Sequence, residues 1–194
     1  MSGGATGGRL FVISGPSGVG KGTLIARARE LVPDLELAIS ATTRPMRPAE
    51  HGGREYHFLS PEEFQRLVEE GAFLEHVEFA GHRYGTLRSE VERRLADGSS
   101  VILEIDVPGA REIERQMPDA VLVFIAPPDV DDLEQRLTAR GTNSPEDIAN
   151  RLRIARAELD ARDDFSHVIV NDNVDRAAAQ LTELIRAALS EERR

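Results

Sequence analysis

The chain has 194 residues, 40% of them hydrophobic, and a formal net charge of −10. That length is typical of one domain with a sizeable core, and the excess of acidic side chains argues against a surface that wraps nucleic acid. Cysteine is absent, an N-terminal signal pattern is lacking, and no apolar run approaches the roughly 20 residues of a membrane helix, so we expect a cytoplasmic protein without disulfides, thiol nucleophiles or a membrane span.

The predicted elements alternate between strands and helices along most of the chain. Nearly continuous apolar runs predict strands at 10–14, 101–105, 120–126 and 167–171. Such runs are typical of strands that are buried on both faces. Helical patterns lie between and after them, at 22–32, 87–98, 108–117, 128–141, 144–162 and 173–192. Strands joined through helices form crossover connections, so we predict an α/β fold with a mostly parallel sheet covered on both sides.

The stretch from 40 to 86 interrupts this alternation. It is rich in turn residues and carries both tyrosines and four of the five histidines. Ser60, Pro61 and Glu63 form the capping signature of a helix at 60–71. We therefore predict an inserted lobe of short strands around this helix.

A glycine-rich turn, "GPSGVGKGT" at 15–23, joins the first strand to the first helix. Backbone N–H groups and the positive end of a helix dipole converge in such a turn, which predicts an anion cradle. The spacing fits the phosphate-binding pattern G-x-x-x-x-G-K, in which the lysine reaches the outer phosphates of a nucleotide. We predict that the whole turn binds ATP, through Gly15, Pro16, Ser17, Gly18, Val19, Gly20, Lys21, Gly22 and Thr23.

Gly22 departs from this pattern, because a Ser or Thr usually ligates Mg²⁺ at that position. Thr23 is one residue late, and one residue turns a helical side chain by about 100°, so Thr23 is a weak substitute. Mg²⁺ keeps much of its hydration shell, so phosphates and waters can hold it. Glu104 and Asp106 end the strand at 101–105 on one pleat face, and we expect Glu104 to hold a metal-bound water.

The inserted lobe contains the residues of a second anion site. Arg44 and Arg47 lie near prolines in "TTRPMRP", and Tyr56 and Tyr84 follow in "REYHF" and "HRYGT". Arginine grips phosphate through two parallel hydrogen bonds, and tyrosine hydroxyls can add further donors. The cluster predicts a phosphate clamp, although each residue alone is more often a surface or core residue.

Across nearly its whole length the chain resembles guanylate kinase. The resemblance rests on "GPSGVGKGT", "SATTRPMRP", "REYHF", "EHVEFAGHRYGT", "VILEIDVPGA", "FIAPP", "RLTARG" and "VIVND", in family order. It implies a P-loop NTPase fold with three α/β/α layers, a GMP-binding lobe and a helical lid. The domain at 8–188 would divide into a core at 8–39, 87–130 and 157–188, a lobe at 40–86 and a lid at 131–156.

The resemblance also implies an activity: transfer of the γ-phosphoryl group of ATP to GMP, and to dGMP, with Mg²⁺, in guanine nucleotide synthesis and recycling. By matching motif, the GMP phosphate would be held by Ser40, Arg44, Arg47, Tyr56 and Tyr84. The guanine edge would be read by Glu75, Thr86 and Asp106, and Asn171 would lie near the adenine of ATP. Lys21 and Arg44 would assist the transfer together with the lid arginines Arg136, Arg140 and Arg151.

Two alternatives remain open at this stage. One is a non-catalytic binding module with the same fold, which would be expected to lose the loop lysine or the lid arginines. The other is a kinase for AMP, whose phosphate loop also ends in Gly-Lys-Gly, but Asp106 and the two lobe motifs favour GMP. The sequence indicates small-molecule partners, no nucleic acid and no membrane, and it favours neither a monomer nor a homo-oligomer.

Overall fold

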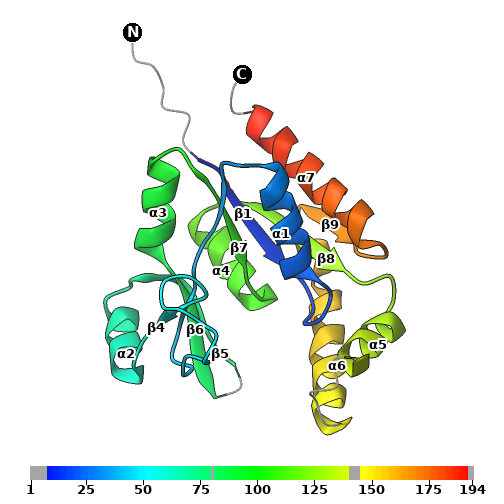
Figure 1. Cartoon of the computed structure of the whole chain (residues 1–194), viewed down its shortest axis with the longest axis horizontal. Helices are drawn as coiled ribbons and strands as arrows, with labels where there is room; N and C mark the ends of the chain where they lie inside the picture. Colours follow the sequence, from blue (N-terminus) through cyan, green and yellow to red (C-terminus); the bar gives the residue numbers. More distant parts are fainter. Residues whose placement is uncertain (1–7, 80, 140–144, 192–194) are drawn as a thin grey trace.

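The main sheet has five parallel strands in the order β2-β7-β1-β8-β9 (Figure 1). The computed structural model describes residues 8–79, 81–139 and 145–191 of the chain. The strands are β1 Leu10–Ser14, β2 Leu35–Leu37, β7 Ser100–Glu104, β8 Val121–Ala126 and β9 His167–Val170. Every connection between consecutive strands of this sheet contains at least one helix, including the one from β2 to β7 that carries the inserted lobe, which confirms the predicted crossover arrangement.

Helices cover the sheet on both faces. They are α1 Lys21–Leu31, α3 Arg88–Ala96, α4 Val107–Gln116 and α7 Val174–Glu191. In β1, Phe11 and Ile13 pack into the apolar cluster under α1 and α7, which lie side by side in Figure 1. Leu10 and Val12 point to the other cluster, with α3 and α4. Both side-chain sets are buried because successive residues of a strand face opposite sides.

Two strands differ from the sequence prediction. β2, only three residues long, was not predicted, because its pattern is too short to separate from the loop around it. β9 was predicted to be buried on both faces, and this is wrong. It lies at the edge of the sheet, so Val168 is 46% and Val170 is 44% exposed, and only Ile169 packs into the core.

The inserted lobe forms its own small sheet, in the order β4-β3-β6-β5. Its elements are β3 Ala41–Thr42, β4 His57–Phe58, α2 Pro61–Glu69, β5 Phe73–Phe79 and β6 His82–Leu87. Ser60 and Glu63 make the predicted capping box at the start of α2. Phe64 stacks on Phe73 with 4.4 Å between ring centroids, inside an apolar cluster separate from those of the main sheet.

Two further helices stand opposite the lobe in Figure 1: α5 Val130–Ala139 and α6 Pro145–Asp160. They pack on each other through Leu133, Leu152 and Ala155. The 3₁₀ helix η1 Arg162–Asp164 then leads into β9. The predicted Arg140, the Gly141 that ends the predicted helix and the turn after it lie outside the described residues. Among the described residues, no helix combines the length and the apolar character needed to cross a bilayer.

Candidate active site

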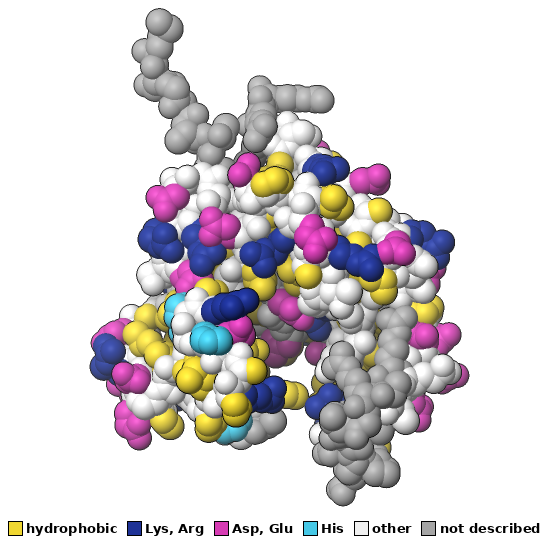
Figure 2. Space-filling model, viewed as in Figure 1, with side chains coloured by type: hydrophobic (Ala, Val, Ile, Leu, Met, Phe, Trp, Pro, Cys, Tyr) yellow, Lys and Arg dark blue, Asp and Glu magenta, His cyan; other side chains and the backbone are white. Residues whose placement is uncertain are grey.

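A cavity of about 660 Å³ opens at the carboxyl ends of the main strands. Its walls come from four parts of the chain: the glycine-rich loop, the ends of β2 and β7, the lobe, and α6. Figure 2 shows the hollow between the lobe and the α5–α6 pair, with acidic side chains at its inner end. This position matches the general rule that open α/β sheets bind ligands at the carboxyl edge.

The glycine-rich loop between β1 and α1 depends on its glycines. Gly15, Gly18 and Gly20 have φ angles of 134°, 88° and 100°, which side chains rarely allow. A Cβ at Gly15 would also lie only 2.2 Å from the Ile125 carbonyl oxygen of β8. The loop therefore turns tightly against β8. Its backbone N–H groups lie next to the start of α1, which is the arrangement of an anion site.

Lys21 is the first residue of α1 and the only lysine of the chain. Its Nζ donates to the carbonyl oxygens of Gly15, at 2.5 Å, and Pro16, at 3.2 Å. Burial lowers the pKa of the Lys21 amine, and the carboxylates of Glu104, Glu158 and Asp106 act in the opposite direction. The neighbouring carboxylates favour the protonated amine. A cation beside an anion-binding loop is placed to contact a phosphate group bound there.

Asn171, directly after β9, contacts the backbone of the glycine-rich loop through its side chain. Its side chain is 1% exposed, and Nδ2 donates to the Val19 carbonyl at 2.7 Å. The same Nδ2 lies 2.7 Å from the place where a Cβ of Gly20 would stand. The side chain thus fixes the loop backbone, and its predicted place beside adenine stays a prediction.

Gly22 lies directly against Glu104, the last residue of β7. A Cβ at Gly22 would be 3.4 Å from Glu104 Oε2. Glu104 faces the cavity. Partial burial of its carboxyl group raises the pKa, and the nearby Lys21 partly reverses that rise. A carboxylate therefore stands beside the position where the usual hydroxyl is missing.

The fit of this region to Mg²⁺ follows from its donors. Within the described residues, no group of three or more His, Cys, Asp or Glu side chains is arranged to hold a metal ion. Thr23 is exposed and Glu104 faces the cavity. These residues fit an Mg²⁺ ion that is held mainly by nucleotide phosphates and water, with protein oxygens contacting its waters.

Asp106 differs in one respect from the sequence prediction. β7 ends at Glu104, so Asp106 is not on the strand with it. It is instead the N-cap of α4, and its Oδ1 accepts from the Gly109 N–H at 2.8 Å. Pro108 in the first turn favours the helix start here, and a local cap outweighs continuation of the strand.

Glu75, Thr86 and Asp106 meet at this helix start. Glu75 is 5% exposed, and its Oε1 accepts from Thr86 Oγ1 at 2.7 Å. A Cβ at Gly109 would lie 2.9 Å from Asp106 Oδ1 and 3.1 Å from Glu75 Oε2. Burial raises the pKa of Glu75 to about 7. Two carboxyl groups from different elements thus converge on one wall of the cavity because glycine leaves them room.

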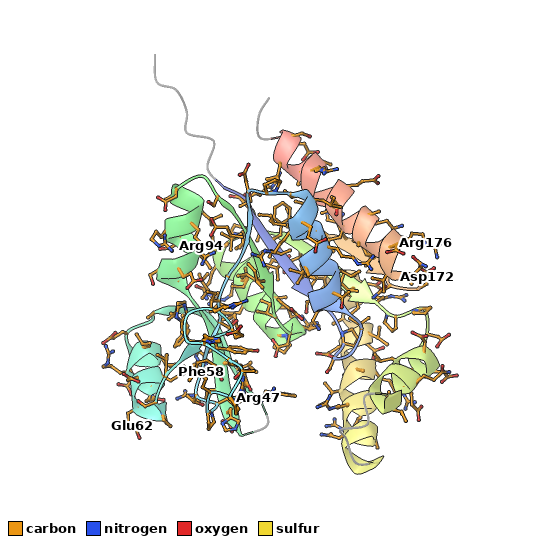
Figure 3. The ribbon with its side chains drawn as sticks, viewed as in Figure 1. Arg47, Phe58, Glu62, Arg94, Asp172 and Arg176 are labelled. Atoms are coloured by element: carbon orange, nitrogen blue, oxygen red, sulfur yellow. The ribbon has the colours of Figure 1, made fainter. Side chains whose placement is uncertain are left out.

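The predicted phosphate clamp is partly assembled in the lobe. Ser40, Tyr56 and Tyr84 line the cavity, and the two tyrosine rings are 6.0 Å apart. The Arg44 guanidinium lies 5.4 Å from the centre of the Tyr56 ring and donates to Glu50 Oε1 at 2.7 Å. Arg47 is exposed on the side of the lobe that faces α6 (Figure 3).

Comparison with known proteins agrees with this geometry. The family model for guanylate kinase matches residues 7–188. The chain belongs to the guanylate kinase family. Its P-loop NTPase fold of α/β/α layers is the one predicted from the sequence.

Individual relatives support the same assignment. A guanylate kinase of Frankia casuarinae is 54% identical over 176 residues, which are 91% of this chain and 96% of that protein. One from Thermobifida fusca is 52% identical over 179 residues, or 92% of this chain and 91% of the relative. The crystal structure of guanylate kinase from Anaplasma phagocytophilum has a TM-score of 0.74 and 31% identity, and it covers 93% of this chain and 86% of that one.

Within this guanylate kinase fold, most of the predicted site residues share the cavity. Two predicted transfer residues are not described: Arg140 lies outside the described residues, and although Arg136 belongs to α5, its side chain lies outside them too. Arg151 does line the cavity from α6. On the same helix face, Ile154 and Glu158 also line it.

Two residues of the site, Glu158 and Gly109, were not predicted from the sequence. Burial raises the pKa of Glu158 to about 7, although Lys21 draws it down. Its spacing of seven residues from Arg151 places both on one face of a helix, and that spacing could have identified it. Gly109 had no comparable signal, because its importance comes from Glu75 on a distant strand.

Proposed function

We propose that this protein transfers the γ-phosphoryl group of ATP to GMP, and also to dGMP, giving ADP and GDP or dGDP. The observation that carries the proposal is that the phosphate loop and the Glu75–Asp106 pair open into one cavity. Family membership supports the same reaction. In this role the protein serves guanine nucleotide synthesis and recycling, and its composition supports a place in the cytoplasm with small-molecule partners and not nucleic acid.

The donor side is the loop at 15–23. We assign the ATP phosphates to its backbone N–H groups and to Lys21, whose amine leaves the carbonyl oxygens of Gly15 and Pro16 for a phosphate of higher charge. Mg²⁺ bound here would supply neutralisation of phosphate charge during transfer of the γ-phosphoryl group. Glu104 is the residue we assign to its water shell, with Thr23 as a weaker second.

The acceptor side is the lobe. Guanine presents N1–H and a 2-amino group as donors, and the carboxylates of Glu75 and Asp106 are acceptors that suit both. Adenine presents an acceptor at N1, which would leave a buried carboxylate without a donor. We assign the GMP phosphate to Ser40, Arg44, Arg47, Tyr56 and Tyr84. Ser40, Tyr56 and Tyr84 line the cavity, and the Arg44 guanidinium lies beside the Tyr56 ring.

The transfer itself needs positioning and charge neutralisation, and no covalent intermediate on the protein. Lys21, Arg44 and Arg151 are the described cations that we assign to the transition state, with Arg136 and Arg140 as further candidates. Closure of the α5–α6 lid over the nucleotides would exclude water, which competes with GMP as acceptor.

The test is an ADP-release assay on the purified protein with ATP and Mg²⁺, using GMP, dGMP, AMP, UMP and CMP in turn. GMP and dGMP are expected to act as acceptors. AMP, UMP and CMP should be at least a hundredfold poorer than GMP in kcat/KM, because buried polar groups of the site would go unpaired with them. Equal rates with AMP would refute the specificity argument. Binding of GMP without any ADP release would favour a non-catalytic module.

A further inference from the structure

The lobe joins the main sheet through two neighbouring stretches of chain. On the way out, β2 ends at Leu37 and residues 38–40 lead into β3. On the way back, β6 ends at Leu87 and α3 begins at once with Arg88. Any displacement of the lobe relative to the sheet must pass through this junction.

Glu90, in the first turn of α3, connects the two stretches. Its Oε1 accepts from the Ile39 N–H at 2.9 Å and from Arg94 Nη2 at 2.9 Å. Its Oε2 lies 2.7 Å from Nε2 of His57 in β4. The Glu90 side chain is only 11% exposed, so a single buried carboxylate joins the outgoing chain, the lobe and its own helix.

Arg94 holds this carboxylate from the core side. Its side chain is 15% exposed, and Nη1 donates to Glu36 Oε2 of β2 at 2.5 Å. In Figure 3, Arg94 lies on α3 at the core side of the junction and Phe58, next to His57, lies in the lobe. Glu90 is therefore anchored to the core by Arg94 and reaches the lobe through Ile39 and His57.

Ile39 and His57, the partners of Glu90 outside α3 and β2, each adjoin a residue of the cavity wall. Ile39 precedes Ser40, and His57 follows Tyr56, while Ser40 and Tyr56 both line the cavity. The backbone N–H of His57 also donates to the carbonyl oxygen of Ser40 at 2.9 Å. Hydrogen bonds to a buried carboxylate are stronger and better oriented than neutral ones, so they fix the backbone beside both residues.

We propose that Glu90 is a positioning residue for the acceptor nucleotide, which holds Ser40 and Tyr56 in place through Ile39 and His57. This inference rests on the proposed assignment of Ser40 and Tyr56 to the GMP phosphate. Glu90 does not line the cavity and contacts no substrate in this role. Its loss should therefore weaken GMP binding while leaving the ATP site, on the glycine-rich loop, unchanged.

The experiment compares variants of the full chain by calorimetric titration with GMP alone and with a non-hydrolysable ATP analogue alone. His57→Leu removes only the lobe contact, and His57→Gln restores an N–H group at about the position of Nε2. Glu90→Ala removes all three contacts, and its thermal unfolding is measured alongside. Glu92→Gln, an exposed carboxylate on the same helix, and His51→Leu, an exposed histidine of the lobe, are the matched controls.

His57→Leu and Glu90→Ala are expected to raise the Kd for GMP roughly tenfold, the size of one charged hydrogen bond, with KM for GMP rising in parallel and kcat changing less. The Kd for the ATP analogue should stay within twofold, and His57→Gln should recover most of the GMP affinity. Unchanged GMP affinity in folded His57→Leu protein, or equal losses for both nucleotides, would overturn the proposal. Failure of the unmodified protein to bind GMP would instead overturn the proposed function beneath it.

Discussion

Lys21 is the first residue of α1, and its amine donates to the loop carbonyls. It is the only lysine of the chain, so no other lysine can take over its role. Lys21→Met removes the charge and keeps much of the apolar stem. We expect turnover to fall by at least about a hundredfold, because a preorganised cation at the transferring phosphate is lost. The measurement is kcat in the ADP-release assay, with the unfolding temperature as a check that the fold is intact.

The uniqueness of this lysine offers a control that does not depend on catalysis. An amine-selective acylating reagent can modify only Lys21 and the N-terminal amine. Burial lowers the pKa of Lys21, which increases its reactive neutral form at neutral pH. ATP should protect Lys21 and not the N-terminus, as read by peptide mass spectrometry; equal labelling with and without ATP would contradict the assigned role, as would near-normal turnover of Lys21→Met.

Glu75 makes GMP binding depend on pH. Burial raises its pKa to about 7, and only the ionised carboxylate can accept from both guanine donors. We therefore expect the Kd for GMP to fall as the pH rises from 6 to 8, measured by calorimetry. The GMP phosphate also titrates in this range, so Glu75→Gln, which cannot ionise, is the control: it should bind GMP more weakly and show a smaller pH dependence.

The raised pKa of Glu75 also affects stability: a rise in pH that strengthens GMP binding should lower the free energy of unfolding. A carboxyl whose pKa is raised from 4.5 to about 7 in the folded protein is ionised first in the unfolded chain, so unfolding releases protons in that window. The free energy of unfolding should therefore decrease as pH rises from about 4.5 to 7, by up to about 3 kcal/mol from Glu75. Glu75→Gln should flatten this decline in denaturant titrations, although Glu158, shifted in the same direction, keeps its own part. An identical slope in the variant would mean that Glu75 titrates normally.

At the scale of elements, Gly109 in the first turn of α4 is subject to two opposing effects: helix propensity disfavours glycine, and the neighbouring carboxylates need the space that glycine leaves. Helix propensity favours Gly109→Ala by about 1 kcal/mol. The added Cβ would however stand 2.9 Å from Asp106 Oδ1 and 3.1 Å from Glu75 Oε2, so the two carboxylates must move apart. We expect GMP affinity to fall roughly tenfold or more while the stability of the fold stays close to normal.

The control for this prediction is Gly52→Ala, because a Cβ at Gly52 meets no atom within 4 Å. Calorimetric titration with GMP and thermal unfolding are measured on both variants. If Gly109→Ala binds GMP as tightly as the unmodified protein, the two carboxylates do not form the acceptor pocket in the arrangement described. A large loss of stability would show that the cost lies in α4 itself.

The first turn of α1 raises the question of the missing hydroxyl. A Cβ at Gly22 is tolerated, at 3.4 Å from Glu104 Oε2, so Gly22→Ser should fold and place a hydroxyl beside Glu104. We expect the Mg²⁺ concentration for half-maximal rate to fall several-fold, because one more oxygen can ligate the ion. Gly22→Ala, which adds the Cβ without the hydroxyl, should not lower it; equal values for Ser and Ala would show that this position does not limit metal binding.

Local patterns predicted much of this fold, and contacts between distant segments account for the rest. β1, the capping box of α2 and the glycine-rich loop were predicted correctly because a few neighbouring residues determine them. The edge position of β9 and the change from strand to cap at Asp106 depend on strand order and helix packing, which no local pattern contains. The same reason hid Gly109 and Glu90, whose roles depend on partners from other elements, whereas Glu158 had a local signal in its spacing from Arg151.

At the scale of the whole molecule, the apolar core is divided. Two clusters flank the main sheet, the lobe has its own around Phe64, and α5 and α6 share another around Leu133. Because the cavity lies between parts that are each packed internally, those parts can move as bodies around the carboxyl edge of the sheet. Arg151 lines the cavity from α6, and Arg47 is exposed on the side of the lobe that faces α6. A bound phosphate between the two parts would reduce the repulsion between these cations.

We therefore predict that both substrates together make the molecule more compact. The measurement is the radius of gyration from small-angle X-ray scattering, without ligand, with GMP, with a non-hydrolysable ATP analogue, and with both. With both, it should fall by on the order of 1 Å toward the roughly 16 Å of a compact chain of this length, because two phosphate groups neutralise the cations that otherwise repel across the cavity. Each ligand alone should give a smaller change, and Arg151→Ala should reduce the change with both, since it removes one cation from the α6 wall. A radius that stays constant at full occupancy, verified by calorimetry, would mean that the cavity is already formed for transfer and that water is excluded by the substrates themselves.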